Sequence, residues 1–239
     1  MTRTLVFVGP TLSGEEVTAR LPGAIVRPPV GVGDVLRALR GRRVARIAII
    51  DGYFERMAAV WHKELLVALE RGVAVWGAAS MGALRAAELA PFGMIGVGKI
   101  YEQLRRGELV ADDEVAVAHL PAEYGFRATS AALVDLRDGL ARAARAGVIT
   151  ARTRDRLIEL ARAPFYRDRS WARLFADGRA AGLPARQLAA LAAWPKPSRK
   201  ADDARLLLRK LAADRGIRPP RVVVPRTWAL RRLRDILQV

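Results

Sequence analysis

The chain has 239 residues, of which 51% are hydrophobic, and it contains no cysteine. This content suffices for one large domain or two small ones, while the missing thiols exclude disulfides, thiolate metal sites, persulfides and cysteine nucleophiles. The formal net charge is +17. Residues 1–125 hold 15 Lys+Arg and 14 Asp+Glu, whereas residues 126–239 hold 26 and 10, an asymmetry that suggests an acidic partner, either nucleic acid or protein.

Strand and helix signals alternate along the first half of the chain. Short apolar runs predict strands at residues 4–8, 24–26, 47–50 and 73–76. The first helical pattern, at Ser13-Gly14-Glu15-Glu16, has the form of a capping box. Further helices are expected at residues 34–39, 58–71, 80–89 and 100–106. We predict a glycine-rich connection at 92–98, which contains no phosphate-binding fingerprint.

Helical patterns dominate the second half, and prolines separate them. They predict helices at residues 131–146, 151–162, 171–180, 185–193, 202–215 and 227–237. The run at 221–224 is rich in valine and predicts a short strand. No apolar run is long enough to cross a membrane and no signal-peptide pattern opens the chain, so we expect a cytoplasmic protein.

These patterns predict an α/β fold with a small, mainly parallel sheet and flanking helices, followed by a basic, mainly helical C-terminal subdomain. We place the α/β core at residues 1–125 and the helical subdomain at 126–239. The strand order stays open and includes orders outside the standard doubly wound sheet. In parallel sheets, sites form at the carboxyl ends of strands, which here are the loops at 9–11, 51–53 and 77–80.

Ser80 lies on the most informative of these loops. The segment Gly77-Ala78-Ala79-Ser80-Met81-Gly82 follows an apolar run and precedes a helix-forming run. This order places Ser80 on a sharp strand-to-helix turn, at a helix N-terminus where backbone N–H groups favour negative charge. Acyl-transfer enzymes present a nucleophile in this way, although their standard spacing is Gly-x-Ser-x-Gly. The simpler alternative, that Ser80 only caps its helix, stays open.

A serine nucleophile needs a base, and the candidates are His62, Lys63 and His119. A lysine serves as a base only when burial or positive neighbours lower the pKa of its ammonium; an exposed surface lysine and a core or loop histidine are the ordinary alternatives. The acidic run at 112–114 is typical either of a divalent-ion site or of a solvated turn. Because the chain has only two histidines and no cysteine, we predict no metal site.

Several blocks in order resemble the TfuA-like family. They begin at Gly9-Pro10-Thr11-Leu12, end at His119, and include the stretches at 50–54, 60–64, 77–88, 92–98 and 112–119. The resemblance thus covers roughly the first half of the chain. The segment at 78–83 is also similar to the serine motif of Clp-type proteases, which serves here as a chemical analogy.

The resemblance implies a role beside a YcaO enzyme, which uses ATP to activate a peptide backbone amide for conversion to a thioamide. Proteins of the family are understood to release sulfide from a thiocarboxylated, ThiS-like sulfur carrier and to help YcaO engage its precursor peptide. The family's hydrolase-like site has a Ser–Lys pair, and the matching positions are Ser80 and Lys63. The choice of Lys63 over Lys99 rests on its lying within a matched block.

We therefore expect Ser80 to be the nucleophile and Lys63 the base. The Met81 backbone N–H, with one from Gly52 or Gly9, would hold the oxyanion. We assign substrate contacts to residues on or beside the same loops and to the last histidine: Thr11, Asp51, His62, Arg85 and His119. No cofactor is expected. A chain without cysteine cannot relay sulfur as a persulfide, which fits transfer by acyl chemistry.

Two other functions remain open at this stage. In the first, the protein is a non-catalytic adapter that brings YcaO together with the carrier or the precursor peptide. In the second, the positive second half binds nucleic acid, although the chain contains no helix-turn-helix, zinc or aromatic-stacking motif of recognised form. For Arg85, a local ion pair with Glu88 is the alternative to contact with an anionic substrate.

Overall fold

A computed structural model describes residues 3–40, 44–55 and 57–238. The chain forms two compact units, one made of residues 1–110 and 201–239 and the other of residues 111–200. The boundary suggested by composition, between residues 125 and 126, lies inside the second unit. The C-terminal residues return to the first unit, so this unit is discontinuous in sequence.

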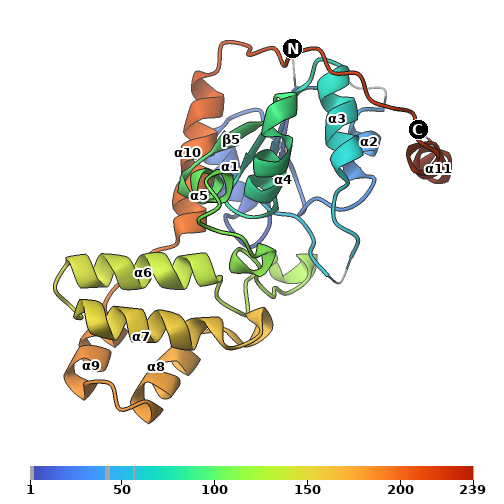
Figure 1. The fold of residues 1–239 in the computed structure, drawn as a ribbon. Coiled ribbons are helices and arrows are strands. Elements are labelled where there is room, and N and C mark those ends of the chain that lie inside the picture. Colours follow the sequence, from blue (N-terminus) through green and yellow to red (C-terminus); the bar gives the residue numbers. More distant parts are fainter. Residues whose placement is uncertain (1–2, 41–43, 56, 239) are drawn as a thin grey trace. The chain divides into compact units, whose positions relative to one another are not determined.

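The first unit is built on a five-stranded, all-parallel sheet (Figure 1). Its strands are β1 (Arg3–Phe7), β2 (Ile25–Arg27), β3 (Val44–Ile49), β4 (Ala74–Ala78) and β5 (Ile95–Val97). The order β2-β1-β3-β4-β5 is that of a flavodoxin-like doubly wound sheet, in which the connection reverses direction between β1 and β3. The predicted α/β class with a parallel sheet is therefore confirmed.

The two faces of this sheet carry separate apolar layers because successive strand residues point to opposite faces. On one face, α1 (Gly14–Arg20) and the part of α10 (Arg199–Ala213) from Ala201 onward cover one set of strand residues. On the other face lie α2 (Asp34–Ala38), α3 (His62–Glu70) and α4 (Met81–Leu89). The helix α5 (Lys99–Arg105) follows β5. At the start of α1, Ser13 Oγ accepts from Glu16 N at 3.1 Å, which is one half of the predicted capping box, while the Glu16 carboxylate pairs with Arg20 and Arg205.

Strand β5 corrects the expected glycine-rich connection at 92–98. Gly96 pairs with Gly77 of β4, and the ring of Tyr101 occupies the space where a Gly96 side chain would lie. In the sequence Gly96 looks like a loop residue, but the strand needs a glycine there because the ring of Tyr101 packs directly against its backbone. Helix α3 also differs from its prediction: it begins at His62, because Ala58 and Ala59 make backbone contacts with Gly31 and Val32.

The end of the chain contains no strand at residues 221–224 of the described structure, so that prediction was wrong. The three valines favour an extended chain, but Val224 N donates to a side-chain oxygen of Glu70 at 2.9 Å and not to a neighbouring strand. The final helix, α11 (Trp228–Leu237), begins one residue after its predicted start, with Thr227 as its N-cap, and ends where predicted. Its buried leucines join the apolar layer formed by α2, α3 and the sheet.

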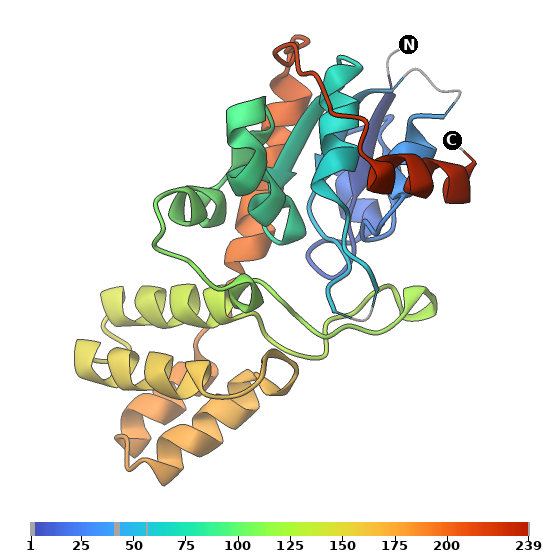
Figure 2. The ribbon, with the colours of Figure 1, turned by 45° about the vertical axis from the view of Figure 1, so that its right-hand side comes forward.

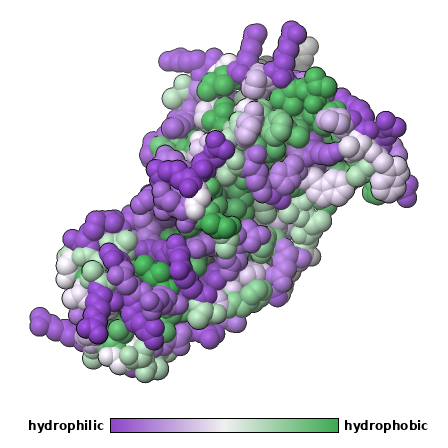
Figure 3. Space-filling view, viewed as in Figure 1, coloured by the Kyte–Doolittle hydropathy of each residue, from purple (hydrophilic) through white to green (hydrophobic). Residues whose placement is uncertain are grey.

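The second unit is a helical bundle of α6 (Leu133–Arg145), α7 (Ala151–Arg162), α8 (Trp171–Ala180) and α9 (Ala185–Ala193), drawn in yellow-green to orange in Figures 1 and 2. Leucines from all four helices form its core. Thr150 and Ser170 cap α7 and α8, each accepting a backbone N–H from the first turn. Hydrophilic side chains cover much of the bundle's visible face (Figure 3).

Candidate functional site

The candidate site lies where β1, β3 and β4 end, at the point where the strand connections reverse. The Asp51 carboxylate is buried and follows β3. It accepts from Gly9 N at 2.9 Å, from Thr11 N at 3.0 Å and from Thr11 Oγ1 at 2.6 Å. Beside it, Ile50 O accepts from Ser80 N at 3.2 Å. Three loops that are distant in the sequence are thereby joined at one edge of the sheet.

The Ser80 turn has an uncommon backbone. Ala79 adopts a φ of 67°, a left-handed conformation that costs a residue with a Cβ of order 1–2 kcal/mol. Ser80 follows at the N-cap position of α4 and is only 9% exposed. Within the described residues its hydroxyl makes no capping bond to the helix. The turn is therefore held by tertiary contacts, as is common at functional sites.

Two glycines hold this turn against the sheet. A Cβ on Gly77 would overlap the carbonyl oxygen of Gly82, and a Cβ on Gly82 would overlap the carbonyl oxygen of Ile49. Gly82 N also donates to Ile50 O at 3.4 Å. Only residues without side chains allow β3, β4 and the start of α4 to approach this closely.

The three predicted oxyanion donors differ in their surroundings. The Gly9 N–H already donates to Asp51. In the part of the chain that the structure describes, the N–H groups of Met81 and Gly52 have no recorded acceptor. Met81 lies in the first turn of α4, and its side chain packs over Gly52, where a Cβ would lie 2.7 Å from Met81 Cγ. These two residues therefore adjoin each other at the start of α4.

His62 and Arg85 meet at one carboxylate. His62 Nε2 lies 2.7 Å from Glu88 Oε2, and Arg85 Nη1 lies 2.7 Å from the same oxygen. Arg85 Nε also donates to Val60 O at 3.1 Å. The predicted local alternative for Arg85, an ion pair with Glu88, is thus present in the structure.

Lys63 contacts the C-terminal part of the chain. It is half-buried in the first turn of α3, and its Nζ donates to Thr227 Oγ1 at 2.7 Å. This partner is 164 residues away in the sequence, so no local pattern could have indicated it. Because α3 starts at the same edge of the sheet as α4, Lys63 shares this edge with Ser80.

Glu64 is a buried carboxyl that the sequence patterns did not single out. Its Oε1 accepts from Gly33 N at 2.9 Å and from Trp61 N at 3.1 Å. Burial raises the pKa of the Glu64 carboxyl above its ordinary value. By binding the starts of both α2 and α3, Glu64 fixes the position of the turn that carries Lys63. In the sequence it could have been found as the glutamate of a capping box, because Glu64 stands three residues after Trp61, the N-cap residue of α3.

His119 and the acidic run belong to the second unit. His119 Nδ1 lies 2.8 Å from Leu120 O, and its ring packs edge-on against Phe126. Asp113 pairs with the buried Arg169 at 2.6 Å. Glu114 pairs with Arg137 at 3.1 Å, and burial raises the pKa of the Glu114 carboxyl. The residues described contain no His/Asp/Glu group suited to a metal, and two of the three acidic side chains here form ion pairs.

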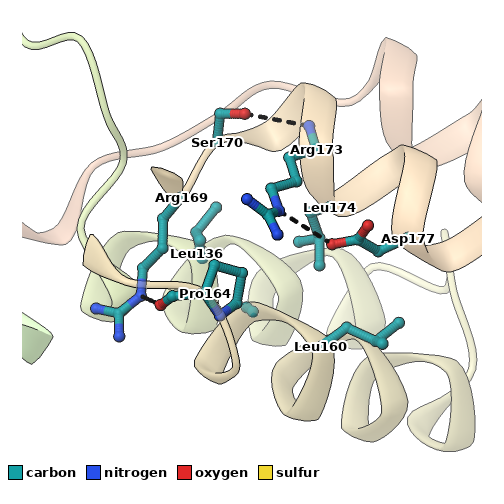
Figure 4. Close-up of a pocket in the computed structure, with 9 residues that line it drawn as sticks. Leu136, Leu160, Pro164, Arg169, Ser170, Arg173, Leu174 and Asp177 are labelled. Carbon is teal, nitrogen blue, oxygen red and sulfur yellow. Dashed lines mark hydrogen bonds and ion pairs between the residues drawn. The ribbon is translucent and has the colours of Figure 1, made fainter. Parts of the chain in front are cut away.

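A small hollow in the second unit lies between α6, α7 and α8 (Figure 4). Its cavity volume is only about 10 Å³, far below the roughly 300–1,000 Å³ typical of ligand sites. The polar groups that line it bond to protein partners: Ser170 Oγ accepts from Arg173 N, Arg173 pairs with Asp177, and Arg169 donates to Pro164 O. These bonds and the small volume make it a poor candidate for the functional site.

No helix in residues 3–40, 44–55 and 57–238 is long and apolar enough to cross a membrane.

Comparison with known proteins agrees with the resemblance seen in the sequence. No curated protein matches the chain. A family model described as TfuA-like protein matches residues 51–170, which include Asp51, Lys63, Ser80 and His119 but not Gly9 or Thr11. The match spans half of the chain, and the protein therefore belongs to the TfuA-like family, which is linked to YcaO-associated processes.

Proposed function

We propose that this protein releases sulfide from a thiocarboxylated, ThiS-like carrier during YcaO-dependent thioamidation, and that it assists YcaO in engaging the precursor peptide. The observation that carries the proposal is the Ser80 turn. A serine at the N-terminus of α4, preceded by a residue with a φ of 67° and followed by a first-turn N–H without a recorded acceptor in the described structure, resembles the way acyl-transfer enzymes present a nucleophile.

The proposed reaction is a hydrolysis through an acyl-enzyme. The amine form of Lys63 takes the proton of the Ser80 hydroxyl, and Ser80 Oγ forms a bond to the thiocarboxylate carbon. The N–H groups of Met81 and Gly52 hold the oxyanion; loss of one such donor costs roughly a hundred- to a thousandfold in rate. The carbon–sulfur bond then breaks, the proton passes to sulfur, and HS⁻ leaves.

Water completes the cycle. It attacks the ester between Ser80 and the carrier, which returns the serine hydroxyl and leaves a carboxylate on the carrier with release of one proton. The net change is one thiocarboxylate and one water to one carboxylate, HS⁻ and H⁺. The small residues around the turn, which include Ala78, Ala79 and Gly82, suit a slim C-terminal tail on the carrier.

The proposal requires one rearrangement. A general base works within about 2.6–3.2 Å of the proton it removes, and Lys63 Nζ bonds to Thr227 in this structure. Lys63 must therefore exchange Thr227 for Ser80 during the reaction. Asp51 has a supporting role, because its bonds to Gly9 and Thr11 hold the loop after β1 beside the reacting serine.

The test is sulfide release from a purified thiocarboxylated carrier, followed with a sulfide-specific probe, with and without YcaO. Ser80→Ala and Lys63→Met are each expected to abolish release. Ser80→Ala should stay folded by circular dichroism, because the backbone bond from Ser80 N to Ile50 O does not depend on the side chain. Ser13→Ala is the matched control: it removes a true cap, should cost about 1 kcal/mol of stability and should leave release intact.

The adapter function is the second candidate, and the engagement of Lys63 by Thr227 favours it. If the protein is only an adapter, the wild type and Ser80→Ala should support thioamidation equally well in assays without added free sulfide. Release by Ser80→Ala at the wild-type rate would refute the nucleophile. Absence of release by the wild type under every condition would leave the adapter.

A further inference from the structure

Residues 222–237, called here the C-terminal strap, lie along α3 and α2 in the first compact unit. One end of the strap is held by Glu70, in the last turn of α3. Val224 N donates to Glu70 Oε1 at 2.9 Å, and Arg226 Nη2 donates to Glu70 Oε2 at 2.6 Å. The same carboxylate thus holds both the backbone and a side chain of the strap.

The other contact with α3 is made by Thr227 at the start of α11. Thr227 Oγ1 caps α11 by accepting from Leu230 N at 3.4 Å, and it also accepts from Lys63 Nζ at 2.7 Å. One hydroxyl therefore ties the beginning of α11 to the proposed base. Removal of this oxygen would weaken the helix cap and release Lys63 together.

The strap contacts α3 along one side of the helix, which carries both Lys63 and Glu70. Lys63 and Glu70 are seven residues apart, so they lie on the same stripe two turns from each other. His62 is about 100° further round the helix, and it pairs with Glu88 of α4. The stripe that carries Lys63 faces the strap, whereas a different stripe faces α4, the helix that begins beside Ser80.

Apolar side chains of the strap pack into the core of the first unit. Val224, Leu230 and Leu233 are buried in the layer that includes α2 and α3, and Leu237 packs against Gly33. Residues 214–221, which connect α10 to the strap, contain no helix or strand. A segment of this kind can lift without disturbing the sheet, because only side-chain contacts and a few hydrogen bonds join it to the rest of the unit.

We propose that the C-terminal strap is a latch on the Ser80 site: when docked it holds the Lys63 ammonium on Thr227, and when lifted it frees Lys63 to act on Ser80. This inference rests on the function proposed above. The strap would keep the sulfur-releasing reaction slow until a partner or the substrate displaces it.

The experiment uses the absence of cysteine in the chain. Leu230→Cys places a single thiol at a position with 0% exposure, so its modification by Ellman's reagent reports opening of the strap. In this background, Thr227→Val should speed modification about tenfold, because it removes a helix cap and one further hydrogen bond. Thr227→Ser keeps the hydroxyl and is the matched control, with the rate of the parent.

A second measurement avoids the buried cysteine. Hydrogen exchange of the peptide that covers α11, followed by mass spectrometry in the otherwise unaltered full chain, should also quicken in Thr227→Val and not in Thr227→Ser. Sulfide release from the thiocarboxylated carrier should rise severalfold in Thr227→Val alone. A thiol and an exchange rate that both stay at the parent value in Thr227→Val would refute the latch.

The two proposals fail in different ways. Faster opening of the strap with an unchanged rate of sulfide release, in a wild type that does release sulfide, would overturn the link between the strap and Lys63. Failure of the wild type and of Thr227→Val to release any sulfide would instead overturn the proposed function, whatever the thiol reports.

Discussion

Gly82→Ala should destabilise the protein even though alanine is the better helix former. Gly82 lies in the first turn of α4, and a Cβ there would lie 2.6 Å from the carbonyl carbon of Ile49 and would overlap its oxygen. Because β3 is central in the sheet, its carbonyl cannot move aside, and the start of α4 must shift by roughly 1 Å in a close-packed interior.

Overpacking of a tight contact costs up to about 3 kcal/mol. The shift also weakens the bond from Gly82 N to Ile50 O, which is worth about 1 kcal/mol. Against these losses stands the helix propensity of alanine, which favours it over glycine by about 1 kcal/mol. The expected net loss in the free energy of unfolding is about 3 kcal/mol.

Gly14→Ala is the matched control for this substitution. Gly14 also begins a helix of the same unit, and a Cβ there would lie 3.4 Å from Val26 Cγ1, an ordinary contact. We expect this variant to be as stable as the parent or up to about 1 kcal/mol more stable. Urea denaturation followed by circular dichroism measures both, and a Gly82→Ala protein as stable as Gly14→Ala would refute the close approach of α4 and β3.

Three further outcomes follow from single contacts. Ala79→Gly should change the free energy of unfolding by less than about 1 kcal/mol in urea, because relief of the φ of 67° offsets the loss of a methyl group buried in an apolar layer; a loss of more than about 2 kcal/mol would contradict that turn. Glu64→Gln should keep both backbone bonds and nearly all stability, whereas Glu64→Ala should lose about 2–3 kcal/mol by leaving one buried and one partly buried N–H group unpaired; equal melting of the two variants would count against the capping role. The Val224 N–H and then the Arg226 guanidinium lower the pKa of the Glu70 carboxyl from 4.5, so the stability that separates the parent from Glu70→Gln should be present above pH 4.5 and should disappear as the pH falls below it; a difference that grows in acid would reverse the sign.

Much of the fold can be predicted because its signals are local. The helices at 151–162, 171–180 and 185–193 were predicted to the residue, since two have a Thr or Ser N-cap and all three have apolar residues at helical spacing. The alternation of strands and helices likewise predicted the parallel sheet. Strand β5 was missed because Gly96, needed for the packing of Tyr101, is locally a loop signal.

Part of the candidate site was also accessible to sequence reasoning. Ser80 was placed on a strand-to-helix turn from the apolar run before it and the helical run after it, and Gly9, Thr11 and Asp51 were placed on loops of the same sheet edge. The structure joins these loops through the Asp51 carboxylate. The roles of Ser80 and Lys63 in catalysis stay predictions.

The sequence by itself determined the class of fold, the family and the position of the Ser80 turn, because each depends on residue spacing within a short segment. Only the tertiary structure decided the left-handed conformation of Ala79, the burial of Glu64 and the contact between Lys63 and Thr227. The last of these joins residues 164 positions apart. A long side chain takes its partner from whichever segment folds against it, and no local pattern carries that information.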